Sequence, residues 1–129
     1  MSFTVTNQGD QTILSAMLAN NPKLHLYNNS YAPVKGTTGS NFTETTVSGY
    51  TAVALTGSSW TIATDGSNNT TATHGSVTFT ICGAEVIQGY YVTTNDGTKV
   101  LFAEQYATPK AYDTNGGSLT VSSLVWQAN

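Results

Sequence analysis

Hydrophobic and polar residues alternate along most of this chain, which is the pattern of β-strands that bury one face. The segment SVTFTIC shows it clearly, with Val77, Phe79 and Ile81 on one face and threonines on the other. Turn-forming residues separate such segments at intervals of about ten residues, and a series of about eight or nine short strands is typical of a sandwich or barrel. The pattern therefore predicts an all-β fold.

The apolar runs between the turns define the expected strands. They cover residues 2–6, 23–29, 42–47, 50–55, 58–64, 70–82, 86–94, 99–106 and 118–127. The run at 42–47 is expected as a short strand or an extended arm, and the run at 70–82 as one strand or as two with a bend at Gly75. Residues 107–117 contain proline and several turn formers, so they are expected to form a loop.

One segment near the N-terminus has the period of a helix instead. Within residues 7–22, four apolar side chains fall on one helical face. These are Ile13, Leu14, Met17 and Leu18. Asn7 or Asp10 is expected to cap the start, and the helix is expected to end before Pro22, because the residue before proline avoids helical angles. We predict that this helix packs its apolar face over the sheets.

Two connections between the strands stand out. Asn95, Asp96 and Gly97 lie between two apolar runs and are expected to supply the positive φ angles of a tight hairpin. Residues 29–41 form a loop that is long for a connection inside one domain. Long loops on a rigid scaffold are where binding is often found, so this loop is the first candidate for a functional surface.

Alternation also predicts which side chains fill the core. In the segment at 23–29, Leu24 and Leu26 face one way, and His25 and Tyr27 face the other. Further residues expected in the core are Trp60, Ile62, Leu119, Val121 and either Val125 or Trp126. Cys82 ends an alternating run and is expected to be a small buried residue.

Composition narrows the range of partners. Charged residues make up 9% of the chain, the net charge is -3, and the four lysines are scattered in a sequence without arginine. Nucleic acids and anionic membrane surfaces both attract clustered cations, so we expect neither as a partner. A length of 129 residues fits one β-sandwich domain spanning residues 1–129.

The cysteine count and the hydropathy pattern bear on where the protein is made. The single cysteine excludes an internal disulfide. The N-terminal segment has no basic region followed by an apolar run, and no stretch approaches the roughly 20 apolar residues of a membrane-spanning helix. We therefore expect neither a signal peptide nor a membrane span, and we expect synthesis in a cytoplasm.

No residue pattern points to catalysis, a metal ion or a cofactor. His25 and His74 each lack a second histidine or a carboxylate at the spacing of a metal site, so both are expected to be solvated or hydrogen-bonded. Most of the aspartates lie in turns, and the turns explain them. Glu104 lies inside an expected strand, and we expect it to make a structural hydrogen bond or a subunit contact.

Several segments together resemble a family of small structural proteins of tailed bacteriophages. They are LHLYNN at 24–29, FTE at 42–44, GY at 49–50, WTI at 60–62 and the hairpin GYYVTTNDGTKVLFAEQ at 89–105. The resemblance implies a jelly-roll-like antiparallel β-sandwich of about eight strands with one short N-terminal helix. It also implies a capsid cement or decoration protein that binds and stabilises the shell of major capsid protein. Such a protein is typically a homotrimer on the capsid surface of the virion and is made in the cytoplasm of a bacterial host.

A protein of this kind needs a contact surface and no active site. We expect contacts from the long loop with Tyr31, Pro33, Val34 and Lys35, from the segment with Phe42 and Glu44, and from the N-terminal arm around Phe3.

Two other functions are compatible with the composition. One is a carbohydrate- or receptor-binding module of a tail fibre or baseplate, which predicts exposed aromatic side chains in a concave site. Tyr31 is the aromatic residue expected to be exposed, because Trp60 is expected in the core. The other is a hydrolase, which requires two acids, or a serine and a histidine, that converge in a pocket.

Overall fold

The computed structural model describes residues 3–56, 60–122 and 124–128, with side chains described as far as Ser122. Within these residues, the elements are α1 (Asn7–Leu18), β1 (Lys23–Tyr27), the 3-10 helix η1 (Gly39–Asn41), β2 (Val53–Ala54), β3 (Trp60–Thr64), β4 (Thr70–His74), β5 (Val77–Ile81), β6 (Glu85–Thr93), β7 (Val100–Tyr112), β8 (Gly117–Val121) and β9 (Leu124–Ala128). The strands pair in antiparallel fashion. The predicted all-β sandwich with one short N-terminal helix is confirmed.

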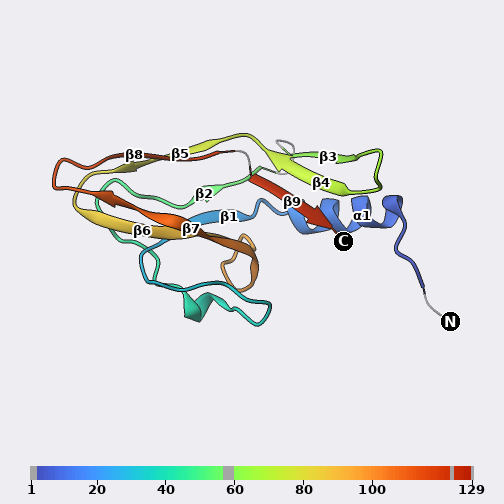
Figure 1. The fold of residues 1–129 in the computed structure, drawn as a ribbon, viewed down its shortest axis with the longest axis horizontal. Coiled ribbons are helices and arrows are strands. Elements are labelled where there is room, and N and C mark those ends of the chain that lie inside the picture. The colour runs from blue at the N-terminus through green and yellow to red at the C-terminus, as the bar shows by residue number, and fades with distance from the viewer. Residues whose placement is uncertain (1–2, 57–59, 123, 129) are drawn as a thin grey trace.

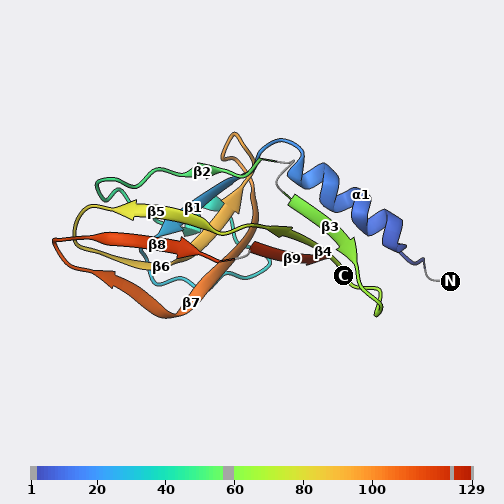
Figure 2. The same ribbon diagram turned by 90° about the horizontal axis from the view of Figure 1, so that it is seen from above.

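The strands form two layers of unequal extent. One layer is a four-stranded sheet in the order β2-β1-β6-β7. The other consists of a β5-β8 pair and a β3-β4-β9 sheet, joined because β4 leads directly into β5 and β8 leads toward β9. The β5-β8 pair lies over the four-stranded sheet, whereas β3, β4 and β9 extend beyond it to meet α1 (Figures 1 and 2).

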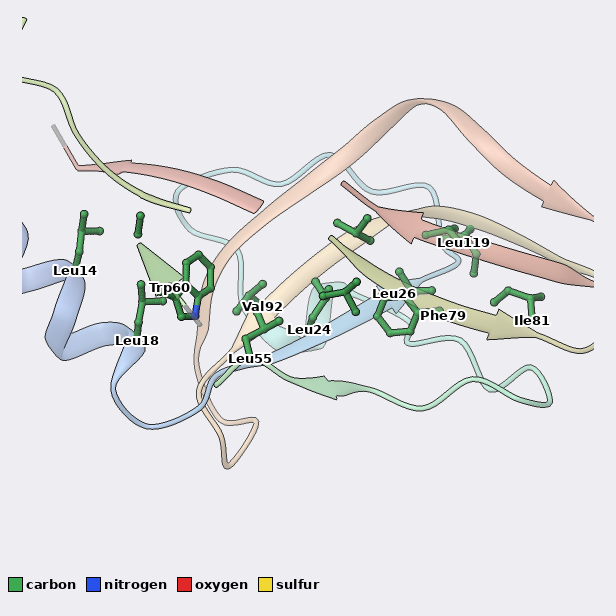
Figure 3. Close-up of a cluster of buried hydrophobic side chains, with 14 residues drawn as sticks. Leu14, Leu18, Leu24, Leu26, Leu55, Trp60, Phe79, Ile81, Val92 and Leu119 are labelled. Atoms are coloured by element: carbon green, nitrogen blue, oxygen red, sulfur yellow. The ribbon is translucent and has the colours of Figure 1, made fainter. Parts of the chain in front are cut away.

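One hydrophobic core runs along the molecule between these layers. Figure 3 shows Leu24, Leu26 and Val92 of the four-stranded sheet facing Phe79 and Leu119 of the β5-β8 pair. At the other end, the core continues into Leu14, Leu18 and Trp60, where α1 packs on β3. Each fully buried side chain of this size contributes about 1.5–3 kcal/mol to folding. The core therefore holds both layers and the helix together.

The helix differs from the prediction in its cap and in its buried face. The N-cap is Thr6, whose Oγ1 accepts a hydrogen bond from the Gly9 N–H at 3.2 Å, and not Asn7 or Asp10. Leu14 and Leu18 are buried, but Ile13 is 48% exposed. Residues four apart lie along one line of a helix, whereas a neighbouring residue is turned by about 100°.

Leu14 and Leu18 face β3 and β4 along a narrow line of the helix, and Ile13 lies beside that line, toward solvent.

No described helix combines the length and the apolar character that crossing a membrane requires.

Some strand boundaries agree with the prediction and others differ from it. Residues 3–6 precede the helix without strand pairing, although a strand was expected there, and the segment 42–47, expected as a short strand or an extended arm, forms one bridge, from Glu44 to Tyr27. The run at 70–82 is two strands separated at Gly75, as one of the two expectations had it. The C-terminal run is also two strands, because β8 pairs with β5 and β9 pairs with β4.

The segment 107–112, which was expected to be a loop, belongs to β7. Gly89 pairs with Gln105 and Ile87 pairs with Lys110, so residues 106–109 of β7 oppose only residue 88 of β6. This large bulge contains Pro109, which has no N–H to donate to a ladder and is tolerated at bulges and edges. The proline therefore bends the strand and does not end it.

The β6–β7 hairpin is also built differently from the prediction. Only Gly97 has a positive φ, of 79°, and its N–H donates to the Thr94 carbonyl at 2.8 Å. The Asp96 carboxylate accepts from the Thr94 hydroxyl at 2.6 Å and from the Thr98 N–H at 3.0 Å. These hydrogen bonds favour the charged form and lower the pKa of Asp96 to about 2. This turn is therefore closed mainly by side-chain hydrogen bonds, and only one of its three residues is left-handed.

Most of the expected core is confirmed, although Ile62 is only partly buried against it. Trp60 is 8% exposed, and Leu119 and Val121 are 3% exposed. The side chains of Val125 and Trp126 lie outside the described residues. Cys82, expected to be buried, is exposed, because β5 ends at Ile81 and the chain turns there toward β6.

Candidate functional site

The long loop is packed against the outer face of the four-stranded sheet, on the side opposite the β5-β8 pair (Figure 1). Its Phe42 is 8% exposed and stacks on Tyr91 of β6 with ring centroids 4.3 Å apart and planes 4° apart. Tyr27 of β1 is fully buried, with its ring 4.7 Å from that of Phe42. Tyr31 meets the same phenylalanine edge-on at 5.4 Å. These four rings form a second core, which we call the aromatic cluster.

His25 extends the aromatic cluster with polar contacts. Its ring stacks on Tyr91 at 4.7 Å, its Nδ1 lies 2.8 Å from Glu44 Oε2, and its Nε2 lies 2.9 Å from Thr93 Oγ1. The Tyr50 hydroxyl also donates to Glu44 Oε2, at 2.6 Å. His25 is therefore hydrogen-bonded, as expected, and its carboxylate partner lies 19 residues along the chain.

The geometry of His25 assigns it a structural role. Both ring nitrogens are engaged by side chains of the protein itself, Nδ1 by Glu44 and Nε2 by Thr93. Together with the stack on Tyr91, these contacts hold the ring against the sheet.

A second carboxylate holds the loop from the sheet side. Glu85 Oε2 accepts hydrogen bonds from the Thr45 hydroxyl and from Asn28 Nδ2, at 3.1 Å for the amide. Burial raises the pKa of Glu85, but the hydrogen bonds from Thr45, from Asn28 and from the Val86 N–H outweigh it, so the net shift is downward. Both ends of the loop are therefore tied to the four-stranded sheet.

The tip of the loop is a closed turn with an exposed apolar residue. Thr37 Oγ1 accepts from the Val34 N–H at 2.8 Å and lies 2.8 Å from the Tyr31 hydroxyl, while the Thr37 N–H donates to the Val34 carbonyl at 3.0 Å. Val34 is nevertheless 67% exposed, and Lys35 beside it is exposed. A hollow of about 420 Å³ separates this turn from residues 100–103 of β7. The loop thus presents Val34 from a fixed position.

The structure divides the expected contact residues into three groups. Tyr31, Pro33, Val34 and Lys35 lie together at the loop turn. Phe42 is buried against the sheet, whereas the Glu44 side chain is 39% exposed and contacts His25 and Tyr50. Phe3 is 90% exposed in the segment before α1, which projects from the end of the molecule where α1 lies (Figure 1).

A second hollow, of about 390 Å³, was not predicted from the sequence. Of its lining residues, only Glu104 was expected to make a structural hydrogen bond or a subunit contact. The hollow also contains Tyr90, Tyr106 and Lys110. Tyr90 pairs with Glu104 in the β6–β7 register, and Tyr106, two residues beyond Glu104, is the diagonal neighbour of Tyr90 on the same face. Lys110 comes from beyond the bulge at 106–109, and alternation could not place it, because a bulge breaks the period of two on which the pattern depends.

Within the described part of the chain, no three or more histidine, cysteine, aspartate or glutamate residues gather in a way that could hold a metal ion. Comparison with family models, with curated proteins and with solved structures finds no match to this chain.

Proposed function

We propose that this chain is a non-enzymatic structural protein of a bacteriophage virion, which binds the shell of major capsid protein and stabilises it. The proposal begins from the resemblance of its sequence segments to small phage structural proteins. The observation that carries it is the loop at 29–41, which is tied down at both ends and still leaves Val34 67% exposed.

The loop turn has the properties of a docking surface. A free, flexible loop would lose conformational entropy on binding, and a loop already held by the aromatic cluster and by Glu44 and Glu85 has lost most of it on folding. Val34 and Pro33 offer apolar area, and Lys35 offers one cation beside them. The surface therefore suits an apolar pocket with an acidic rim on a capsid subunit.

The N-terminal arm supplies a second, separate contact. Phe3 is 90% exposed and Val5 is 46% exposed, although both are apolar. Because this arm lies at the end of the molecule away from the β5-β8 pair, one copy can bridge two neighbours (Figure 1). We propose that the chain acts as a homotrimer on the capsid surface, with arms and loops that span joints between capsid subunits. Burial of new surface across the joints stabilises the assembled shell by mass action.

Binding to expanded empty capsids of the phage that encodes this chain tests the proposal. We expect saturable binding to the shell and a higher shell melting temperature. Val34→Asp and Phe3→Asp should each weaken binding at least tenfold, because a carboxylate must then be desolvated in the interface. Light scattering coupled to size-exclusion chromatography gives the mass of the free oligomer.

Val86→Asp is the matched control, because Val86 is an apolar residue of similar kind, 41% exposed on β6, outside both contact surfaces. It should bind like the wild type. Absence of saturable binding by the wild-type protein, or equal weakening by all three aspartate variants, would contradict the proposal.

A further inference from the structure

The second hollow lies along the open side of the sandwich. β7 is the edge strand of the four-stranded sheet, and β8 is an edge strand of the β5-β8 pair. Tyr90, Glu104, Tyr106 and Lys110 come from β6 and β7, and Thr120 comes from β8. Buried Val121, 3% exposed, also lines the hollow. We call this hollow the tyrosine groove.

The bulge in β7 shapes the tyrosine groove and protects its edge. Residues 106–109 leave the ladder with β6, which turns the strand sharply, as Figure 2 shows. Pro109 ends the bulge and Lys110 follows it on this edge strand, and both residue types discourage the addition of another strand. The bulge therefore disfavours pairing with a further strand and leaves room for a small ligand beside β7.

The lining combines neutral rings with polar side chains that have hydrogen-bonding capacity left, namely Glu104, Lys110 and Thr120, whose Oγ1 also lies 3.0 Å from Thr78 Oγ1. The rings of Tyr90 and Tyr106 meet edge-on with centroids 6.1 Å apart. Burial raises the pKa of both phenols, so the rings stay neutral. The Tyr90 hydroxyl donates to Glu104 Oε2 at 3.5 Å, which is long for a hydrogen bond and leaves the carboxylate open to other donors. Lys110 Nζ lies 5.7 Å from the centre of the Tyr106 ring and forms no ion pair with Glu104.

We propose that the tyrosine groove binds a neutral sugar, of one or two rings, as a function separate from assembly on a shell. A pyranose ring has an apolar face of C–H groups and a rim of hydroxyls. The apolar face matches the tyrosine rings, and the rim matches Glu104 as acceptor, Lys110 as donor and Thr120 as either. A volume of about 390 Å³ lies within the range of small-ligand sites.

The charges argue for a neutral ligand over an ionic one. An anionic sugar would be attracted by Lys110 but repelled by the carboxylate of Glu104. A cationic ligand would be attracted by Glu104 but repelled by Lys110. The opposite charges of Glu104 and Lys110 cancel for a ligand at a distance. At short range the two side chains act as a separate hydrogen-bond acceptor and donor. A purely apolar ligand would leave both groups without partners.

Saturation-transfer NMR with neutral disaccharides tests this proposal. The probes are lactose, maltose, cellobiose and chitobiose at millimolar concentration, with sialyllactose as the anionic comparison. We expect at least one neutral probe to receive saturation, most strongly at the protons of one ring face. Tyr106→Ala should abolish the signal, and Glu104→Gln, an exposed substitution that leaves the fold intact, should weaken binding about tenfold.

Tyr31→Ala is the control, because it removes a partly buried tyrosine of the loop and leaves the tyrosine groove unchanged. It should bind the sugar normally, even if it weakens binding to the capsid. No saturation of any neutral probe, a signal only from sialyllactose, or a signal that survives both Tyr106→Ala and Glu104→Gln would overturn the proposal.

Discussion

Gly89 is the residue on which the packing of the aromatic cluster depends most closely. It pairs with Tyr27 across β1 and β6, and a Cβ at this position would collide with the Glu104 carbonyl oxygen and lie 2.7 Å from the Tyr27 hydroxyl. The Tyr27 hydroxyl also donates to the Tyr31 carbonyl at 2.8 Å. The missing side chain therefore makes room for a ring that joins the sheet to the long loop.

We expect Gly89→Ala to lower the free energy of unfolding by about 2–3 kcal/mol, because the new methyl group overpacks a site with backbone on one side. Urea unfolding at neutral pH measures this. Gly36→Ala is the matched control, since no atom lies within 4 Å of its Cβ position, and it should change stability by less than about 0.5 kcal/mol. Equal effects of the two substitutions would mean that Gly89 has no special packing role.

The side of the sheet on which a residue lies could be predicted from the alternation of apolar and polar residues. Leu24 and Leu26 follow the alternation and lie in the main core. His25 and Tyr27 were expected on the other face, and that face is also buried, because the long loop covers it. Alternation gives the face of a strand but not what covers it, so neither the partner of His25 nor the burial of Phe42 was available from the sequence.

The long loop behaves as a structural element in its own right. It contains one turn of 3-10 helix at η1 and one bridge to β1, yet it has a core of its own in Phe42. The backbone also contributes, since the Thr45 N–H donates to the Leu26 carbonyl at 3.0 Å and the Asn28 N–H donates to the Thr43 carbonyl at 2.9 Å. Hydrogen bonds hold its two ends together, and the buried ring of Phe42, directly after residue 41, anchors its C-terminal end to the sheet.

Phe42→Ala should therefore release the loop while the sandwich remains folded. We expect a loss of about 3–5 kcal/mol, the usual cost of removing a buried phenylalanine, and much faster cleavage within 29–41 by a nonspecific protease. Val34→Ala, at the exposed tip of the same loop, should change neither stability nor cleavage. A loop that resists protease equally in both variants would show that Phe42 does not anchor it.

Elements with regular periods were predicted well, and irregular ones were not. The helix, the bend at Gly75 and the β6–β7 hairpin follow from local signals: a period of 3.6, a glycine in a strand, and an Asn-Asp-Gly turn. The extension of β7 beyond Tyr106 was missed because Pro109 usually marks a loop, and here a bulge accommodates it. Lys110, which completes the lining of the tyrosine groove, lies beyond that bulge, so the groove as a whole was missed for the same reason.

At the scale of the whole molecule, tyrosine hydroxyls make polar contacts that charged side chains often make in other proteins. Charged residues are only 9% of the chain, and there are seven tyrosines. Burial raises the pKa of six of them: Tyr27, Tyr50, Tyr90, Tyr91, Tyr106 and Tyr112. The phenols of Tyr27 and Tyr50 also donate part-buried hydrogen bonds, to the Tyr31 carbonyl and to Glu44, in places where an ionised group would be costly. The fold is therefore sensitive to high pH.

We expect stability to fall as pH rises from 10 to about 12. A tyrosine with an ordinary pKa of 10.0 ionises in the unfolded chain first, while burial raises the pKa of Tyr90 and Tyr91 in the folded chain to about 12. Over this interval the folded state binds more protons than the unfolded state, so a rise in pH favours unfolding. Below pH 10 the contribution is fully present, and above about pH 12 it is lost.

Tyr91→Phe isolates one of these contributions, because burial and the nearby charge of Glu44 both raise the Tyr91 pKa and the substitution keeps the ring stack on Phe42. Relative to its own stability at neutral pH, this variant should lose less than the wild type between pH 10 and about pH 12. Urea unfolding at a series of pH values gives the difference, and ultraviolet absorbance follows tyrosinate formation. If tyrosinate forms in the folded protein near pH 10 without loss of stability, the phenols are open to solvent and the two cores are not closed around them.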